Sequence, residues 1–354
     1  MSESAQPFDL NRVKVFPLSQ RNTLTRVDDF LVNPDSAAAP LSEATARLID
    51  LAVQQIQTAK QRGASVMLIY GAHLLKNGAA GIVGKLIEHG WLTHLATNGA
   101  GSIHDWECAW QGATSECVKT NVASGTFGTW DETATNIHLA ILCGALDGLG
   151  YGQSIGRFIC EDCVTIPEVA VLHALIASAP GDALTPARAD LLQTLTRQKI
   201  PPGLRHVEHR WPQTSMLAAA YRHNVAATIH PGIGYDIISN HPIFSGAAIG
   251  RAGEIDFKLF ASAVEKLEGG VVLNVGSAIM GPQVFEKTLS CVNNVRIQEG
   301  KPAIAGHSIF VVDIQDGGNW DWSQGEPPKD HPAYYLRFCK TYSRMGGAMH
   351  YVQC

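Results

Sequence analysis

The chain has 354 residues, of which 45% are apolar and 17% charged, and its formal net charge is −5. This composition is typical of a globular protein with a large core and excludes a disordered or collagen-like chain. Because no basic block could neutralise a run of phosphates, we expect no nucleic-acid partner. No apolar run approaches about 18 residues and the chain does not start like a signal peptide, so we predict a cytoplasmic protein without a membrane partner.

Cysteine and histidine spacing gives little support for a metal site. Of the eight cysteines, Cys160 and Cys163 form the one close pair, and a zinc ribbon would need a second pair. No HExxH or HxxxH pair is present among the histidines. We therefore predict no bound metal, and we interpret the close pair as reduced thiols, with a metal or redox role as the less favoured alternative.

The amino-terminal half begins with an irregular arm over residues 1–40, where proline, serine and charged residues follow no period. From Ser42 to Arg62 apolar residues recur on one helical stripe, and Gly63 follows as a stop, which predicts an amphipathic helix. Next come a buried-strand pattern over 66–70, a helical one over about 79–89 and another strand pattern over 91–96. This βαβ succession implies parallel strands.

The same alternation returns later in the chain. Strands are predicted over 225–229, 271–275 and 308–313, with helices near 256–267 and 282–294 between them. Prolines interrupt two helical segments between about 155 and 220, which predicts a helical excursion packed on the same sheet. We predict a single α/β domain over residues 41–354, with a Rossmann-like, mostly parallel sheet and helices on both faces.

Three expected strand ends carry glycine-rich or polar sequence, at 70–78, 96–105 and 274–281. Ligands of parallel sheets bind beyond the carboxyl ends of the strands. None of the three matches GxGxxG or a Walker loop, and each alone is more typical of turn geometry than of a ligand loop. Three such ends in one chain favour a bound dinucleotide or phosphate.

Two features near the carboxyl end suit amine chemistry. Residues 314–323 combine acids, a Gly-Gly pair and two tryptophans, which could hold a cation or could form a surface turn over the core. Lys340 is surrounded in sequence by Phe338, Cys339, Tyr342 and Met345. Burial there would favour the neutral amine that imine formation needs, although lysines more often extend to solvent.

Together these stretches resemble the deoxyhypusine synthase family, NAD-dependent enzymes that move an aminobutyl group from spermidine to a protein lysine. The resemblance covers most of the chain from about residue 65 to 350. It is carried by the order and spacing of 71–78, 84–90, 97–101, 230–236, 269–276 and 315–321, and by Pro332, which stands eight residues before Lys340. It implies a deoxyhypusine synthase-like NAD-binding fold and a homotetramer with active sites between subunits.

The resemblance also implies roles for individual residues. Lys340 would be the imine-forming catalytic residue, and Asp236, Asp321 and His104 would bind the substrate. The residues that would hold NAD are Ala72, His73, Thr97, Asn98, Gly99, Asp105, Gly276 and Asp313. The donor would be a spermidine-like polyamine, and the acceptor another small amine or a protein lysine.

Four positions depart from the family's pattern. Met280 stands in place of a histidine, His104 and Tyr334 in place of acids, and Phe338 in place of a tryptophan. Three hypotheses therefore stay open. The chain is an NAD-dependent aminoalkyl transferase of the deoxyhypusine or homospermidine synthase type, a divergent member that serves as a binding or assembly protein, or an enzyme that performs a different amine reaction with the same cofactor.

Overall fold

A sheet of six parallel strands forms the centre of the computed structural model, which describes residues 6–353. Its order across the sheet is β10-β9-β8-β2-β3-β7, and each neighbouring pair is parallel. Strands β2 and β8 are neighbours although β3 and β7 separate them in the chain, so the strand order reverses between them. This is the strand order of the Rossmann fold, and the predicted fold class is confirmed. The bounds are β2 Val66–Tyr70, β3 His94–Asn98, β7 Ala226–His230, β8 Val271–Val275, β9 Ser308–Asp313 and β10 Ala348–Gln353.

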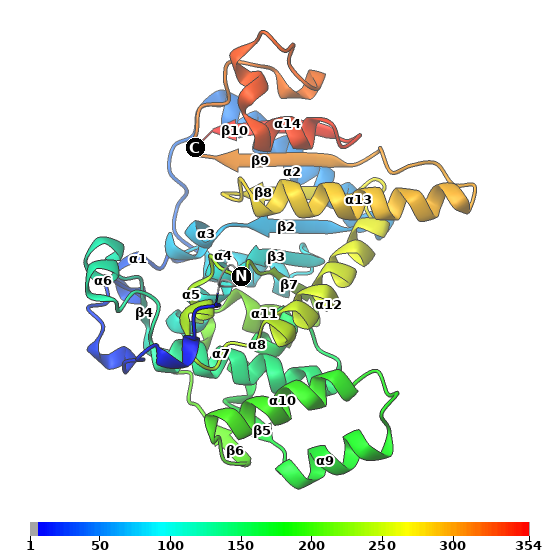
Figure 1. Ribbon diagram of the computed structural model, residues 1–354. Coiled ribbons are helices and arrows are strands. Elements are labelled where there is room, and N and C mark those ends of the chain that lie inside the picture. Colours follow the sequence, from blue (N-terminus) through cyan, green and yellow to red (C-terminus); the bar gives the residue numbers. More distant parts are fainter. Residues whose placement is uncertain (1–5, 354) are drawn as a thin grey trace, which may run out of the picture.

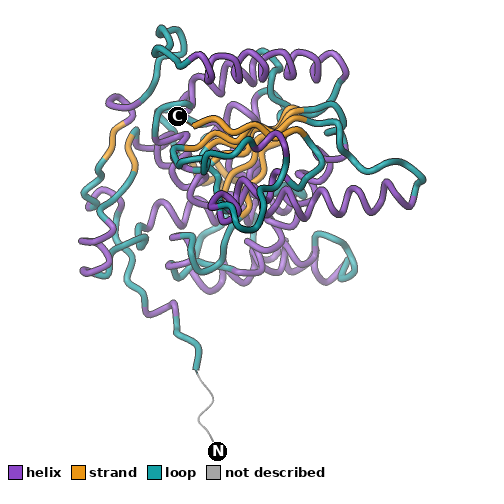
Figure 2. The backbone as a smooth tube through the Cα atoms, turned by 90° about the horizontal axis from the view of Figure 1, so that it is seen from above, coloured by secondary structure: helices purple, strands orange, loops and turns teal. Residues whose placement is uncertain are grey.

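Helices cover both faces of the sheet, as Figure 2 shows from above. On one face α12 (Gly246–Glu265), α13 (Met280–Gln298) and α14 (Arg337–Ser343) pack in succession, and on the other lie α2 (Glu43–Arg62), α4 (Ala80–Glu88) and α11 (Met216–Arg222) (Figure 1). Helix α2 begins and ends as expected: the Ser42 side chain accepts a hydrogen bond from the Thr45 N–H, and Gly63 has a φ of +66°.

Residues 155–220 contain the two predicted helices, α9 (Val169–Ser178) and α10 (Thr185–Gln198). A small antiparallel sheet, which the sequence did not indicate, joins β5 (Cys163–Ile166) to β6 (Gly203–His206) beside them. The flanking helices α8 (Tyr151–Glu161) and α11 pack against β7 and against each other. The excursion is therefore anchored to the main sheet at both of its ends.

Two helices of the core were missed. Helix α7 (Asp131–Gly144) is buried along most of its length and so has no polar stripe that would give it a helical period. Helix α5 (Gly99–Gln111) begins inside the glycine-rich stretch 96–105, for which the sequence predicts a loop. Its first turn forms because the Asn98 side chain accepts a hydrogen bond from the Gly101 N–H at 2.9 Å.

The amino-terminal arm packs along its own chain. Residue Phe16 bridges to Trp130, and Leu18 is buried. Strand β1 (Thr25–Arg26) pairs with β4 (Ala113–Thr114), and α1 (Val27–Phe30) follows. The arm therefore reaches the segment that follows α5. No helix within residues 6–353 is long and apolar enough to cross a membrane.

Candidate functional site

The two strands at the reversal of strand order end on glycines that lie against each other. The Gly71 N–H donates to the Val275 carbonyl at 3.0 Å, and the Gly276 N–H donates to the Val312 carbonyl at 2.9 Å. A Cβ at Gly71 would lie 2.1 Å from the Gly276 carbonyl oxygen, whereas a Cβ at Gly276 would meet no atom within 4 Å. Folds with this strand order bind dinucleotides in the crevice at the reversal, where backbone must approach closely.

The predicted NAD residues border this crevice in part. Ala72 and His73 open the short helix α3 (Ala72–Lys76) directly after Gly71. Thr97 ties the end of β3 to β2, since its hydroxyl donates to the Tyr70 carbonyl at 2.9 Å. Gly276 follows β8, and Asp313 ends β9, where its carboxylate accepts a bond from the Gln315 N–H. Gly71 and Gly276 carry no side chain that would block the close approach of a dinucleotide at these strand ends.

Asp105 is buried where α5 meets the start of α11. It is fully buried, and its carboxylate accepts the Met216 N–H at 2.8 Å and the Ser215 hydroxyl. Burial raises its pKa to about 7, against the lowering effect of those hydrogen bonds. The observed contacts join α5 to the start of α11, and the cofactor role predicted for Asp105 stays a prediction.

A cavity of about 280 Å³ opens beside α5. It brings together two of the three predicted substrate residues, His104 and Asp236, with side chains that the sequence analysis did not single out. The charged members of that second group come from the arm, α3, α5 and the segment after β4, and they are Arg21, Lys76, Glu107 and Glu116.

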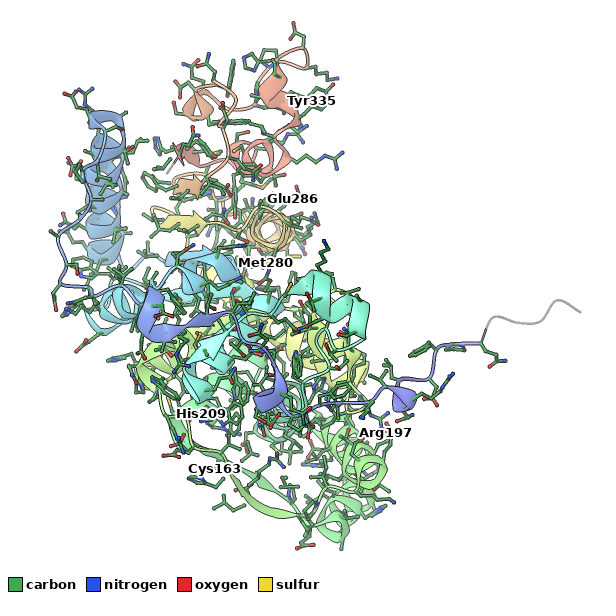
Figure 3. All side chains as sticks on the ribbon, turned by 90° about the vertical axis from the view of Figure 1, so that its left-hand side faces the viewer. Cys163, Arg197, His209, Met280, Glu286 and Tyr335 are labelled. Atoms are coloured by element: carbon green, nitrogen blue, oxygen red, sulfur yellow. The ribbon has the colours of Figure 1, made fainter. Side chains whose placement is uncertain are left out.

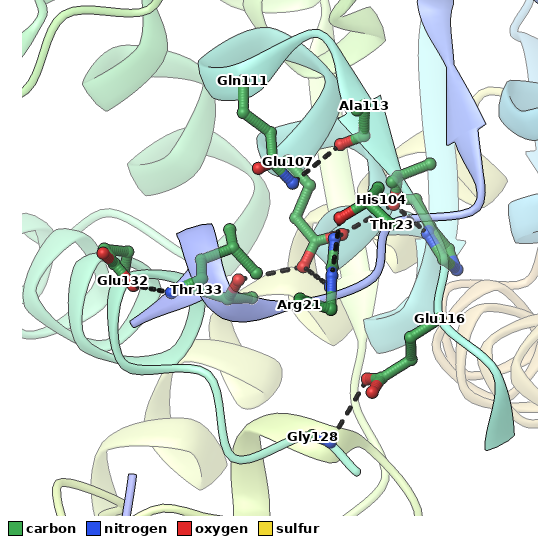
Figure 4. Close-up of polar contacts among 12 residues, drawn as sticks. Arg21, Thr23, His104, Glu107, Gln111, Ala113, Glu116, Gly128, Glu132 and Thr133 are labelled. Carbon is green, nitrogen blue, oxygen red and sulfur yellow. Dashed lines mark hydrogen bonds and ion pairs between the residues drawn. The ribbon is translucent and has the colours of Figure 1, made fainter. Parts of the chain in front are cut away.

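One wall of the cavity is a buried ion pair between the arm and α5 (Figure 4). The Arg21 guanidinium donates to both oxygens of Glu107, at 2.7 and 2.9 Å, and each side chain is 1% exposed. Hydroxyls of Thr133 and Thr114 also donate to this carboxylate, at 2.9 and 2.7 Å. Bidentate geometry and these two further hydrogen bonds offset the desolvation of the two charges.

This network fixes the hydrogen-bonding state of His104. Its Nδ1 lies 2.7 Å from the Thr114 hydroxyl oxygen, whose single hydrogen goes to Glu107. Nδ1 must therefore carry the hydrogen, which leaves Nε2 as an acceptor. Burial is the main cause that lowers the pKa of His104 to about 4, so the ring is neutral at pH 7.

The carboxylate of Asp236 lies against the start of α5. A Cβ at Gly99 would lie 2.0 Å from its Oδ2, so the glycine allows the approach. Oδ2 accepts the Gly232 N–H at 2.8 Å, and burial raises the pKa of this carboxyl to about 6. At pH 7 Asp236 is mostly ionised and provides an acceptor for a cation.

The third substrate residue and the predicted nucleophile lie elsewhere. The Lys340 Nζ lies 3.6 Å from the centre of the Tyr334 ring and does not line the cavity. Asp321 is exposed and accepts local hydrogen bonds from Ser323 and Gln324, which lower its pKa. It lines a separate, open hollow of about 720 Å³ with Trp320 and Tyr351.

Two of the four residues that depart from the family's pattern, Met280 and Phe338, are core residues. Met280 starts α13 and is 9% exposed, within the apolar cluster on the α13 face of the sheet (Figure 3). Phe338 is buried in the same cluster. Neither side chain supplies the imidazole or the indole N–H that the resemblance implies at its position.

No family model matches this chain, and no curated protein matches it. The solved structures that resemble it include unliganded AgrE (TM-score 0.41, 13% identity) and ArgZ, an arginine dihydrolase from cyanobacteria (TM-score 0.39, 10% identity). The aligned region covers 90% and 88% of this chain, but 32% of each of those chains, so this chain spans about a third of their length. A proposed deoxyhypusine synthase from Entamoeba histolytica aligns over 71% of this chain and 66% of its own (TM-score 0.30, 10% identity). The fold assignment rests on the strand order itself.

Proposed function

We propose that this chain is an NAD-dependent enzyme that transfers an aminoalkyl group from a spermidine-like donor to an amine acceptor through an imine on Lys340. The observation that carries the cofactor assignment is the contact of Gly71 with Gly276 at the reversal of strand order. The resemblance in sequence, which covers the strand ends and the segment around Lys340, supports the transfer chemistry.

NAD, when bound, would supply reversible removal of a hydride from the carbon next to an amine nitrogen. The neutral amine of Lys340 would then attack that carbon. The bond between this carbon and the nitrogen of the departing amine would break, and that nitrogen would take up the proton lost by the lysine. The acceptor amine would attack the same carbon and release Lys340. Return of the hydride gives a new secondary amine, so the transfer has no net oxidation or reduction.

The proposal requires a second copy of the chain to bring Lys340 to the cavity. Within one chain Lys340 and the cavity with His104 and Asp236 do not share a lining. We propose that a homotetramer, as the resemblance implies, brings α14 of one subunit to the cavity of another.

One observation favours a second candidate, a binding or assembly protein without transferase activity. The centre of the Tyr334 ring lies 3.6 Å from the Lys340 Nζ, so the ring occupies one side of the nitrogen that would have to attack carbon. An acid at position 334 is what the family's pattern has, and tyrosine replaces it here.

Borohydride trapping tests the proposal. The protein is incubated with NAD and spermidine, reduced, digested with trypsin and examined by peptide mass spectrometry. An adduct on Lys340 blocks cleavage there and appears on the peptide Phe338–Arg344. The adduct should disappear in Lys340→Arg and persist in Lys329→Arg, an exposed lysine. Bound NAD with no adduct from spermidine or any other amine would overturn the transferase and leave the binding protein.

A further inference from the structure

We infer that the cavity beside α5 binds an amine that also carries a carboxylate, an amino acid, in preference to the polyamine donor of the proposed function. The inference rests on the proposed function only in taking this cavity as the amine site. It follows from the charges of three lining residues, Lys76, Asp236 and His104.

Lys76 provides a free positive charge. It ends α3, is partly buried and lines the cavity, and its ammonium makes no ion pair or hydrogen bond with another described residue. Arg21, the second cation of the lining, is neutralised by Glu107. In a partly buried space an unpaired ammonium attracts an anionic group and repels a cationic one. Lys76 is therefore placed to hold a ligand's carboxylate.

Asp236 and His104 provide acceptors for an ammonium. One carboxylate oxygen of Asp236 takes the Gly232 N–H, and its other oxygen makes no hydrogen bond with a described residue. The Nε2 of His104 is an acceptor because Thr114 and Glu107 fix the tautomer. A primary ammonium has three N–H groups and suits such a pair.

Glu116 lines the same cavity without forming an ion pair with Lys76. Its two oxygens accept hydrogen bonds from the Asn121 side chain, at 2.5 Å, and from the Gly128 N–H, at 3.2 Å. It therefore holds the segment 116–128 in place, and no ion pair joins it to Lys76. Lys76 stays available to a ligand.

The rest of the lining suits a short apolar chain between two charged ends. Ile103, Val118, Phe127 and Ile237 line the same space. The cavity volume of about 280 Å³ leaves room for a small molecule such as a diamino acid. Spermidine has similar size but no group for Lys76, so charge and not size discriminates between the two classes.

The test compares L-lysine with cadaverine, the same chain without its carboxylate, by calorimetry on the full chain with NAD present. We expect L-lysine to bind at least about tenfold more tightly than cadaverine. A tenfold difference in affinity corresponds to about 1.4 kcal/mol, which is the size of one charge-assisted contact. Lys76→Gln should abolish this preference and Lys76→Arg should keep it. Lys119→Gln, an exposed lysine outside the cavity lining, should leave it unchanged.

Each result separates this inference from the proposed function. Cadaverine or spermidine binding as tightly as L-lysine, or no binding by any of the three, would overturn the inference. A spermidine adduct on Lys340 that is indifferent to Lys76→Gln keeps the transferase and overturns the amino-acid assignment. L-lysine binding that depends on Lys76, without an adduct on Lys340, keeps the assignment and overturns the imine on Lys340.

Discussion

The cavity beside α5 and the segment around α14 hold their charged side chains in different ways. In the cavity, Arg21 and Glu107 are 86 positions apart in the chain and form a buried ion pair. Around α14, Asp321 takes hydrogen bonds from residues two and three positions away and stays exposed. Arg344 and Glu326 likewise pair at the surface.

This difference bears on which region is a pre-organised site. A buried network whose members come from distant segments orients each group and makes an electrostatic contact strong, because water does not screen it. Exposed pairs contribute little to stability and leave their side chains free to rearrange. The cavity therefore has fixed acceptors in the single chain, whereas Asp321, Glu326 and Arg344 near Lys340 are held by exposed contacts.

The largest expected effect comes from breaking the buried ion pair. Arg21→Met leaves the Glu107 carboxylate buried without its cation, and should lower the free energy of unfolding by about 3–5 kcal/mol in urea denaturation. Arg47→Met is the matched control, since its pair with Glu43 is 80% and 90% exposed, and should cost less than about 1 kcal/mol. Equal losses in the two variants would remove the contrast between the two regions.

The next effect is a pH dependence at the inner end of α5. Burial raises the pKa of Asp105 from 3.8 to about 7, so the folded state holds a proton that the unfolded state has released. The stability from this group is fully present below pH 3.8 and is lost as the pH rises to about 7. Asp105→Asn should therefore gain stability relative to the wild type as the pH rises through this window, by on the order of 1 to 4 kcal/mol.

Urea denaturation at a series of pH values measures this difference between the two proteins. The buried histidines, whose pKa values are lowered, affect the wild type and the variant alike and cancel in the comparison. A constant difference across the window would show that Asp105 titrates normally in the folded chain.

A smaller effect is expected where Gly99 allows Asp236 to approach α5. Gly99→Ala would place a Cβ 2.0 Å from the Asp236 carboxylate. The substitution should lower the free energy of unfolding by about 1–3 kcal/mol and should weaken ligand binding in the cavity. Gly84→Ala in α4 meets no atom within 4 Å and should stabilise by up to about 1 kcal/mol through helix propensity. A stabilising Gly99→Ala would mean that Asp236 is free to move.

The smallest effect concerns the contact of Lys340 with Tyr334. Tyr334→Leu removes the ring below the ammonium and should cost about 0.5–1 kcal/mol, measured as a small decrease in the thermal midpoint. Tyr334→Phe keeps the ring and should behave like the wild type. A large loss in the leucine variant would show that α14 is as firmly ordered in the single chain as the cavity.

Much of the fold follows from local patterns in the sequence. The strands at 271–275 and 308–313 are confirmed to the residue, and the helix from Ser42 ends at Gly63 as expected. The strand expected at 91–96 is shifted to His94–Asn98, and the helix expected from about 256 begins at Gly246. Helix α12 begins earlier than expected because the Ser245 side chain caps it, accepting a hydrogen bond from the Ala248 N–H.

The alternation of strands and helices in the sequence thus determined the α/β class, because the spacing of apolar residues within each segment indicates whether it is a helix or a strand. Tertiary structure alone decided the strand order and the membership of the cavity. Arg21, Lys76, Glu107 and Asp236 come from four separate segments, and no local period relates them. They meet because the arm and α5 pack beside the sheet and bring these charges into one partly buried space. In such a space a charged side chain is stabilised by an ion pair or a hydrogen bond.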